Sequence, residues 1–247
     1  MRKAIVIIVP YCLKTKAQKL ISLGCCFMLW ISGGCTDSGN KEKPAIAPGQ
    51  QEVKKEELPS DHTTKNKNIV FFGNSITAGY GVDPTASFPA WIQTKIDSLK
   101  LPYKVVNAGL SGETSAGGNS RIDWILRQRI SIFVLELGGN DGLRGIPMSE
   151  TIRNLQAIID KVRQKYPSSK IVLAGMQIPP NMGEKYTSEF RNVFKQLASR
   201  NKVYLIPFLL EGVGGVPELN QPDGIHPNVQ GHKIVAENVW KVLEPIL

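Results

Sequence analysis

The stretch NIVFFGNSITAGYG, residues 68–81, sets the architecture that we expect for this chain. It begins with a short continuous apolar run, Ile69–Phe72, and then turns through Gly73 and Asn74 into Ser75. A continuous apolar run, unlike an alternating one, is typical of a strand buried on both faces of a parallel sheet. Ser75 is therefore expected just beyond the carboxyl end of a buried strand.

The same pattern recurs toward the carboxyl terminus, where short apolar runs alternate with longer amphipathic segments. In one such segment, residues 149–166, apolar side chains recur at helical spacing and form a single stripe. Strict alternation of strands and helices predicts an α/β fold, a three-layer α/β/α sandwich with a five-stranded parallel sheet and right-handed crossovers. The predicted strands are Ile69–Phe72, Lys104–Asn107, Ile132–Leu137, Ile171–Gly175 and Val203–Pro207, and the predicted helices are Phe88–Leu99, Gly118–Arg129, Ser149–Tyr166, Glu184–Arg200 and His232–Leu243.

The composition is that of one globular domain preceded by a separate leader. The chain has 247 residues, of which 42% are hydrophobic and 21% charged, and this excludes the disordered and multi-span membrane classes. Residues 1–35 carry five basic residues and no acid, so the net charge of +9 falls to +4 for the remainder. Without a dense basic run and interleaved aromatics, the composition gives no support to a nucleic-acid partner.

The first 35 residues have the layout of an export signal. Three lysines precede the apolar run Leu20–Ile31, which is followed by Ser32, Gly33, Gly34 and Cys35. Basic residues, a short apolar core and small residues at a cleavage point are typical of a signal peptide. The core of about a dozen residues is also shorter than the ~20 needed to cross a bilayer as a helix. An uncleaved membrane anchor is the alternative, and both readings place the rest of the chain outside the cytoplasm.

Three segments follow from this layout. A cysteine directly after small residues resembles a bacterial lipoprotein signal, which implies a signal peptide in residues 1–35 and a lipid anchor at Cys35. Residues 36–66 are polar, mixed in charge and without apolar periodicity, so we expect a flexible tether. Residues 67–247 contain no cysteine, which excludes disulfides and cysteine metal sites there.

Ligands of open parallel sheets bind at the carboxyl ends of the strands, so the residues after each strand are the candidates for chemistry. Ser75 follows the first strand and is either a nucleophile or a turn serine. A glycine-containing loop, residues 109–112, follows the second and either presents a backbone N–H to an anion or completes a turn. Asn140 follows the third, after two glycines, and either donates its amide into the same cleft or belongs to an ordinary Asn-Asp-Gly turn.

The last candidate is an Asp-x-x-His pair, Asp223 and His226, in a loop shaped by glycine and proline ahead of the final helix. An aspartate at this spacing can orient the imidazole for general-base catalysis. The alternatives are a metal pair and a plain loop hydrogen bond. A metal would need further ligands, and His232, which we expect to be structural or solvated, is the one other histidine of the domain. We predict no metal site and no organic cofactor.

Taken together and in this order, these residues resemble the SGNH (GDSL-type) hydrolase family across residues 68–247. Two long motifs, V-L-E-L-G-G-N-D-G-L-R-G and D-G-I-H-P-N, resemble its branch of periplasmic multifunctional thioesterases, lysophospholipases and arylesterases. The resemblance implies an SGNH/flavodoxin-like fold. It also implies Ser75 as nucleophile, His226 as general base and Asp223 as its orienting partner, with an oxyanion hole formed by the backbone N–H groups of Ser75 and Gly112 and the side-chain amide of Asn140.

The substrate implied by the resemblance is a small-molecule acyl ester, hydrolysed through an acyl-enzyme. The apolar loop after the fourth strand would border the acyl pocket, with Ile178, Pro179 and Tyr186 as candidate lining residues. One departure stands out, because the family usually has Asp before the serine and this chain has Asn74. A carbohydrate O-deacetylase of the same fold, and a catalytically silent surface lipoprotein that serves as a binding module, are the alternative functions.

Overall fold

A computed structural model describes residues 67–247, with the side chain of Pro180 excepted. The predicted signal peptide, the lipid anchor at Cys35 and the tether of residues 36–66 lie outside the described residues. Within the described part, no helix combines the length and the apolar character that a membrane crossing requires.

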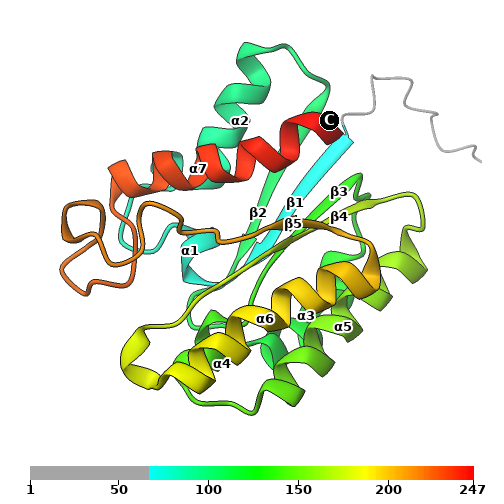
Figure 1. The fold of residues 1–247 in the computed structure, drawn as a ribbon. Coiled ribbons are helices and arrows are strands. Elements are labelled where there is room, and N and C mark those ends of the chain that lie inside the picture. Colours follow the sequence, from blue (N-terminus) through cyan, green and yellow to red (C-terminus); the bar gives the residue numbers. More distant parts are fainter. Residues whose placement is uncertain (1–66) are drawn as a thin grey trace, which may run out of the picture. The chain divides into compact units, whose positions relative to one another are not determined.

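The centre of the domain is a five-stranded sheet in which every neighbouring pair is parallel (Figure 1). The strand order is β2-β1-β3-β4-β5, so the chain starts in the sheet, adds one strand on one side and then builds outward on the other. This confirms the predicted parallel α/β architecture. The strands are β1 (Lys67–Gly73), β2 (Tyr103–Gly109), β3 (Ile132–Glu136), β4 (Lys170–Ala174) and β5 (Tyr204–Ile206).

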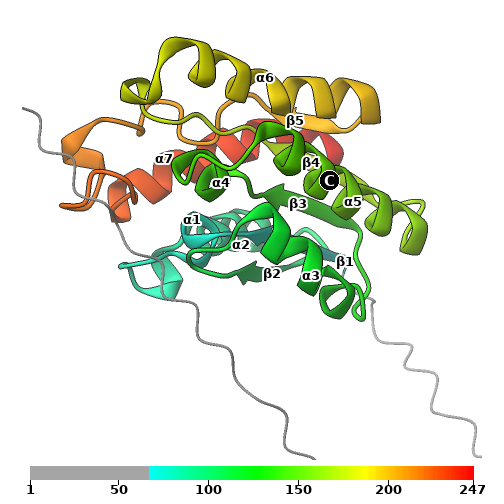
Figure 2. The same cartoon turned by 90° about the horizontal axis from the view of Figure 1, so that it is seen from below.

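Helices cover both faces of the sheet and complete the three layers. α2 and α7 lie together on one face, whereas α3, α5 and α6 lie on the other (Figures 1 and 2). Their bounds are α2 (Phe88–Ser98), α3 (Ser115–Ile125), α5 (Met148–Lys165), α6 (Glu184–Asn201) and α7 (Val229–Leu243). Two shorter helices, α1 (Ser75–Ala78) and α4 (Gly139–Leu143), follow β1 and β3, and single 3-10 turns occupy Pro84–Ala86, Pro180–Met182, Pro217–Leu219 and Glu244–Ile246.

Two helices begin three residues earlier than their apolar pattern predicts, because a polar side chain caps each start. The Thr114 side chain accepts a hydrogen bond from the backbone N–H of Gly117 and caps α3. Asn228 accepts one from Gly231 in the same way and caps α7. Capping satisfies backbone donors that have no partner inside the helix, so it sets where the helix begins.

The central strands are buried as their continuous apolar runs predict. All five residues of β3 are buried, and so are the last five of β1. Every strand runs in the same direction, so the carboxyl ends of all five meet at one edge of the sheet. The described sheet, its helices and the apolar core that they enclose all lie within residues 67–247.

Candidate active site

Ser75 is the first residue of α1 and lies directly beyond the end of β1. Asn74 caps this short helix, because its Oδ1 accepts a hydrogen bond from the backbone N–H of Ile76 at 3.0 Å. Gly79 ends the helix in the left-handed conformation, with φ of 77°. Ser75 is thus held at the tip of a tight strand-to-helix turn, facing the carboxyl edge of the sheet.

The structure joins Ser75 to the predicted Asp-x-x-His pair. The Nε2 atom of His226 lies 2.8 Å from Oγ of Ser75, although 151 positions separate the two residues. Nδ1 of the same ring lies 2.7 Å from Oδ2 of Asp223. The imidazole bridges hydroxyl and carboxylate, the arrangement in which a histidine can take a proton from serine.

Asp223 is fixed as an anion. Its Oδ1 accepts hydrogen bonds from the backbone N–H groups of His226, at 3.0 Å, and of Ile225, at 2.9 Å. These bonds, the one from the His226 backbone first, lower the pKa of Asp223 to about 2. An ionised Asp223 favours a proton on Nδ1 of His226, which leaves Nε2 free to accept the serine proton.

Gln221 connects the loop that carries His226 to the loop that follows Ser75 through hydrogen bonds. The Gln221 side-chain amide donates to the carbonyl oxygens of Tyr80, at 2.7 Å, and of Pro227, at 3.0 Å. Its backbone N–H donates to the carbonyl oxygen of His226 at 2.8 Å. The ring of Tyr80 lies against that of His226, with centroids 4.7 Å apart. Sequence analysis missed both residues, since neither stands in a recognisable motif.

Asn140, at the start of α4, lines the same cleft as Ser75. Its side-chain amide donates to the carbonyl oxygen of Glu113 at 2.9 Å, so the amide is already oriented. Gly112 lies in the exposed adjoining loop with φ of 78°, and its carbonyl accepts a hydrogen bond from Arg144 at 3.0 Å. The neighbouring Glu113 is buried and paired with Arg121, which anchors this loop to α3.

A cleft of about 490 Å³ opens at Ser75 and His226. Ile178 and Pro179 line it, and Leu143 and Phe208 add to its apolar wall. Tyr186 does not belong to the described residues that line it. The Tyr186 hydroxyl instead donates to the carbonyl oxygens of Gly142 and Ile146, so this side chain supports α4 from behind.

The carboxylate of Glu136, the last residue of β3, lies buried beneath the serine turn. It accepts hydrogen bonds from the backbone N–H of Asn74 at 3.0 Å, from the Asn74 side-chain amide at 2.7 Å and from the Thr77 hydroxyl at 2.8 Å. A Cβ atom on Gly73 would lie 2.2 Å from the Thr77 hydroxyl oxygen and 2.5 Å from Oε2 of Glu136, so only glycine fits there. Sequence analysis placed Glu136 in a strand without a role.

Burial raises the pKa of Glu136 from its ordinary value of 4.5 to about 7, although the hydrogen bonds from Thr77 and Asn74 act in the opposite direction. Among the described residues, no lysine, arginine or histidine pairs with this carboxylate. Its charge is therefore held only by neutral donors of the serine turn.

His232 is structural. It is buried on α7, and its Nδ1 accepts a hydrogen bond from the backbone N–H of Phe88 at 3.3 Å. Burial, with a smaller contribution from the charge of His226, lowers the pKa of His232 from 6.5 to about 4. No group of three or more histidine, cysteine, aspartate or glutamate residues in the described part is arranged to hold a metal ion.

The pKa shifts of Glu136 and His232 have opposite effects on how the free energy of unfolding changes with pH. In the folded protein Glu136 keeps a proton that the unfolded chain releases. Its contribution to the free energy of unfolding therefore falls as pH rises from about 4.5 to about 7. His232 binds a proton only when unfolded, so its contribution rises between about pH 4 and 6.5.

We predict that Glu136→Gln makes the free energy of unfolding rise more steeply with pH than in the wild type. The two curves should diverge by on the order of 3 kcal/mol across this window, since each pKa unit corresponds to about 1.4 kcal/mol. Urea unfolding at a series of pH values measures this. Glu189→Gln, which removes an exposed carboxyl group on α6, is the control. Parallel curves for the wild type and Glu136→Gln would contradict the raised pKa.

Comparison with known proteins agrees with this geometry. The sequence profile of the GDSL-like Lipase/Acylhydrolase family matches residues 71–234. Esterase TesA of Pseudomonas aeruginosa is 40% identical over 182 residues, which are 73% of this chain and 90% of that protein. Thioesterase 1/protease 1/lysophospholipase L1 of Escherichia coli K12 is 36% identical over 180 residues, which are 72% of this chain and 84% of that protein.

The solved structures extend the likeness to the fold. The crystal structure of TesA superimposes with a TM-score of 0.71 and 40% identity, over 73% of this chain and 100% of that one. The matched region therefore amounts to a complete folded protein in that relative. Profile, sequence and structure agree, and the chain belongs to the GDSL-like lipase/acylhydrolase family.

Proposed function

We propose that this protein is a serine esterase that hydrolyses carboxylic esters through an acyl-enzyme, with Ser75, His226 and Asp223 as its catalytic residues. The observation that carries the proposal is the hydrogen-bonded chain from Ser75 Oγ through His226 to Asp223, at 2.8 and 2.7 Å, at the mouth of an apolar cleft. The retention of all three groups argues against a catalytically silent binding module.

In the first half-reaction, Oγ of Ser75 attacks the ester carbonyl carbon while Nε2 of His226 takes the hydroxyl proton. The carbonyl oxygen becomes an oxyanion, for which the backbone N–H groups of Ser75 and Gly112 and the side-chain amide of Asn140 are the proposed donors. As the intermediate collapses, the C–O bond to the alcohol breaks and His226 returns the proton to the leaving oxygen. The products are the free alcohol and an ester of Ser75.

In the second half-reaction, His226 takes a proton from water as the water oxygen attacks the acyl-enzyme. The second oxyanion occupies the same position as the first. Collapse breaks the bond to Oγ, His226 returns the proton to Ser75, and the carboxylic acid leaves. The anion of Asp223 stabilises the imidazolium that forms in each half-reaction.

The shape and lining of the cleft favour an acyl chain over a sugar. Ile178, Pro179, Leu143 and Phe208 form an apolar wall, which suits a hydrocarbon better than the polar groups of a carbohydrate. The relatives are named as an esterase, a thioesterase/lysophospholipase and an arylesterase. We propose a medium- or long-chain carboxylic ester such as a lysophospholipid, because acyl thioesters of coenzyme A are scarce outside the cytoplasm.

Export and anchoring complete the proposal. The apolar run Leu20–Ile31, the small residues after it and Cys35 support secretion followed by lipid attachment at Cys35. The catalytic domain would then work outside the cytoplasm, tethered to a membrane through residues 36–66.

We expect Ser75→Ala to lose hydrolysis of p-nitrophenyl esters by at least about 10³-fold, because the attacking atom is removed. Labelling by a fluorophosphonate should vanish in parallel. Ser120→Ala, which removes an exposed helix serine, is the matched control and should keep both. Full activity in Ser75→Ala would refute the assignment. Acyl chains from acetate to palmitate separate the substrate classes, since an optimum at acetate would indicate a deacetylase.

For Asn140→Ala we expect kcat to fall roughly 10²–10³-fold with little change in KM, because an oxyanion donor acts mainly in the transition state. Asn238→Ala serves as the control, since the Asn238 amide also donates to loop carbonyl oxygens but belongs to α7. A loss confined to KM would show that Asn140 binds substrate and does not stabilise the oxyanion.

Cys35→Ala tests the anchor. In a bacterial host fed an alkyne-bearing fatty acid, the full chain should become labelled, whereas the Cys35→Ala variant should not, because the thiol that receives the lipid is absent. Cys26→Ala, a second leader cysteine, should leave the label in place. Equal labelling of wild type and Cys35→Ala would place the lipid elsewhere.

A further inference from the structure

The two edges of the sheet differ in charge. At the edge where the strands begin, each strand has at least one exposed basic residue in its first two positions or in the segment just before it. The four segments that lead from a helix into β2, β3, β4 and β5 contain no acidic residue. We call this set of seven side chains the basic edge: Lys67, Lys100, Lys104, Arg127, Arg129, Lys170 and Lys202.

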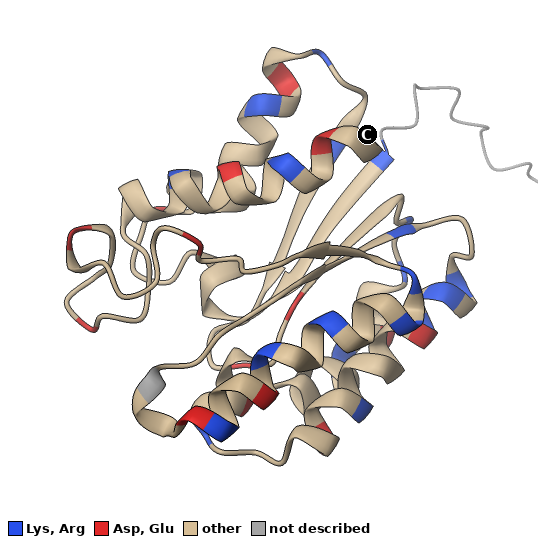
Figure 3. Ribbon diagram, viewed as in Figure 1, with Lys and Arg blue, Asp and Glu red and all other residues tan. Residues whose placement is uncertain are grey.

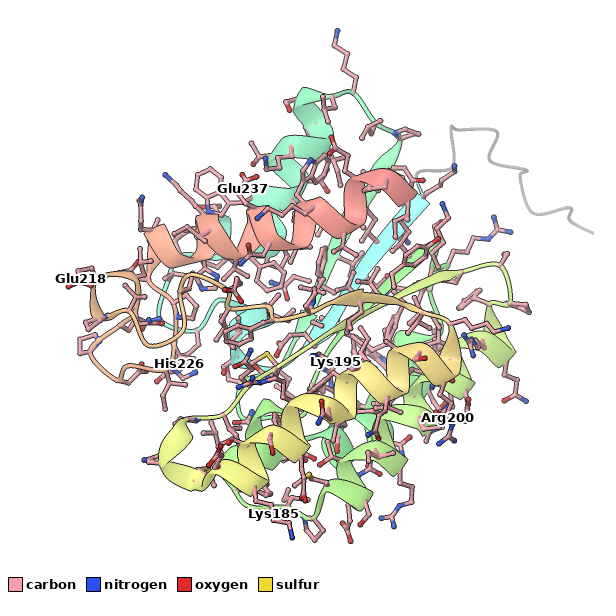
Figure 4. The ribbon with its side chains drawn as sticks, viewed as in Figure 1. Lys185, Lys195, Arg200, Glu218, His226 and Glu237 are labelled. Carbon is pink, nitrogen blue, oxygen red and sulfur yellow. The ribbon has the colours of Figure 1, made fainter. Side chains whose placement is uncertain are left out.

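The opposite edge, which carries the cleft, has several exposed acidic residues, although the exposed Arg144 also lies there. Its exposed charges include Asp83, Glu211, Glu218 and Asp223. Figure 3 shows Lys and Arg on the segments where the strands begin, with some Asp and Glu on the neighbouring helix ends, and it shows Asp and Glu on the loops near the cleft. In Figure 4 the labelled Arg200, next to the basic edge, and His226 lie at opposite ends of the molecule.

Ordinary structural roles do not account for most of the basic edge. Cations at the end of a helix stabilise its dipole, and Lys202, the C-cap of α6, has that position, but the other six residues are neither in a helix nor cap residues. None forms an ion pair with a carboxylate of the described residues. Lys67 lies over the Tyr103 ring at 5.3 Å, and Lys170 donates to the carbonyl oxygen of Ile246, so these contacts leave the charges uncompensated.

Exposed aromatic and apolar side chains accompany these charges. Trp124, in the last turn of α3, is 67% exposed, and Arg127 donates its backbone N–H to the carbonyl oxygen of Trp124. Tyr204, the first residue of β5, and Leu99, directly after α2, are 44% and 54% exposed. Tryptophan and tyrosine are enriched where proteins meet the head-group layer of a bilayer, because one end of each ring is apolar and the other polar.

The chain also enters the domain at this edge. Residues 1–66, with the apolar run Leu20–Ile31 and Cys35, join the described domain at Lys67, a member of the basic edge. Any membrane attachment through that segment therefore pulls on the same edge that carries the cations and Trp124.

We propose that the basic edge, with Trp124, Tyr204 and Leu99, is a docking surface for an anionic lipid bilayer, and that docking turns the catalytic cleft toward the aqueous side. Cations attract the anionic head groups, and the aromatic rings enter the interface. A soluble polyanion would satisfy the cations but would leave the three apolar side chains in water. The inference goes beyond the esterase activity and does not depend on it.

Residues 67–247 are the protein to test, because they hold the described core and the whole chain of the solved relative matches 73% of this chain. In sedimentation assays, the domain should bind vesicles made of equal parts phosphatidylcholine and phosphatidylglycerol and should not bind pure phosphatidylcholine. Salt should weaken the binding, since it screens the attraction between cations and head groups.

Neutralising three residues of the basic edge should lower this binding by about a hundredfold. Each basic residue near an anionic surface contributes about a factor of five, and the variant Lys104→Gln, Arg127→Gln, Arg129→Gln removes three. Its control is Lys185→Gln, Arg191→Gln, Lys233→Gln, which makes the same change in net charge toward the other ends of α6 and α7. Equal losses in both triple variants would overturn the proposal, because net charge alone would then explain binding.

Trp124 reports the orientation directly. Brominated phosphatidylglycerol should quench the fluorescence of the wild-type domain, and Trp124→Phe should abolish most of that quenching while esterase activity toward a soluble ester stays unchanged. Quenching that survives Trp124→Phe would mean that another face meets the lipid. Binding to dextran sulfate as tight as to the anionic vesicles, without quenching by the brominated lipid, would assign the edge to a polymer and refute the lipid docking.

Discussion

The buried carboxylate of Glu136 is the contact through which the sheet holds Ser75, the proposed nucleophile. Its donors, from Asn74 and Thr77, flank Ser75 on the same turn, and Glu136 itself ends the adjacent central strand. Ser75 must meet a histidine from a loop near the other end of the chain, and small displacements of reacting groups are costly for catalysis. A charge held in the interior by neutral donors alone destabilises the fold. In this protein the destabilising charge of Glu136 lies directly beneath Ser75.

Much of the architecture was predictable because buried parallel strands leave an unambiguous trace. Every predicted strand overlaps an observed one. The central strands β1, β3 and β4 are the clearest, since a strand covered on both faces must be apolar along its length. The rule that ligands bind at the carboxyl ends of the strands pointed to Ser75 and Asn140, which line one cleft together with His226. α1 and α4 escaped prediction, because helices of four and five residues are too short to show a period.

The contacts that support the site were not predictable, because their partners are far apart in the sequence. Glu136 and Asn74 are 62 positions apart, and Gln221 reaches Tyr80 across 141. A single carboxylate inside an otherwise apolar strand was the one signal that pointed to Glu136. For Tyr186, nearness in sequence was misleading. Its position close to the apolar loop suggested that it lines the pocket, whereas its hydroxyl donates hydrogen bonds to α4 and to the segment after it.

Asn74, where the family pattern expects aspartate, changes the electrostatics beneath Ser75 and still caps the short helix α1. Its amide nitrogen lies 2.7 Å from Glu136, and a carboxyl group there would bring two acids together in a buried site. Such a pair cannot ionise fully and would share a proton. The amide supplies its N–H at every pH, so the ionisation of Glu136 alone alters these contacts. The backbone N–H of Ile76 still donates a hydrogen bond that caps the helix, because asparagine, like aspartate, has a side-chain oxygen that can accept it.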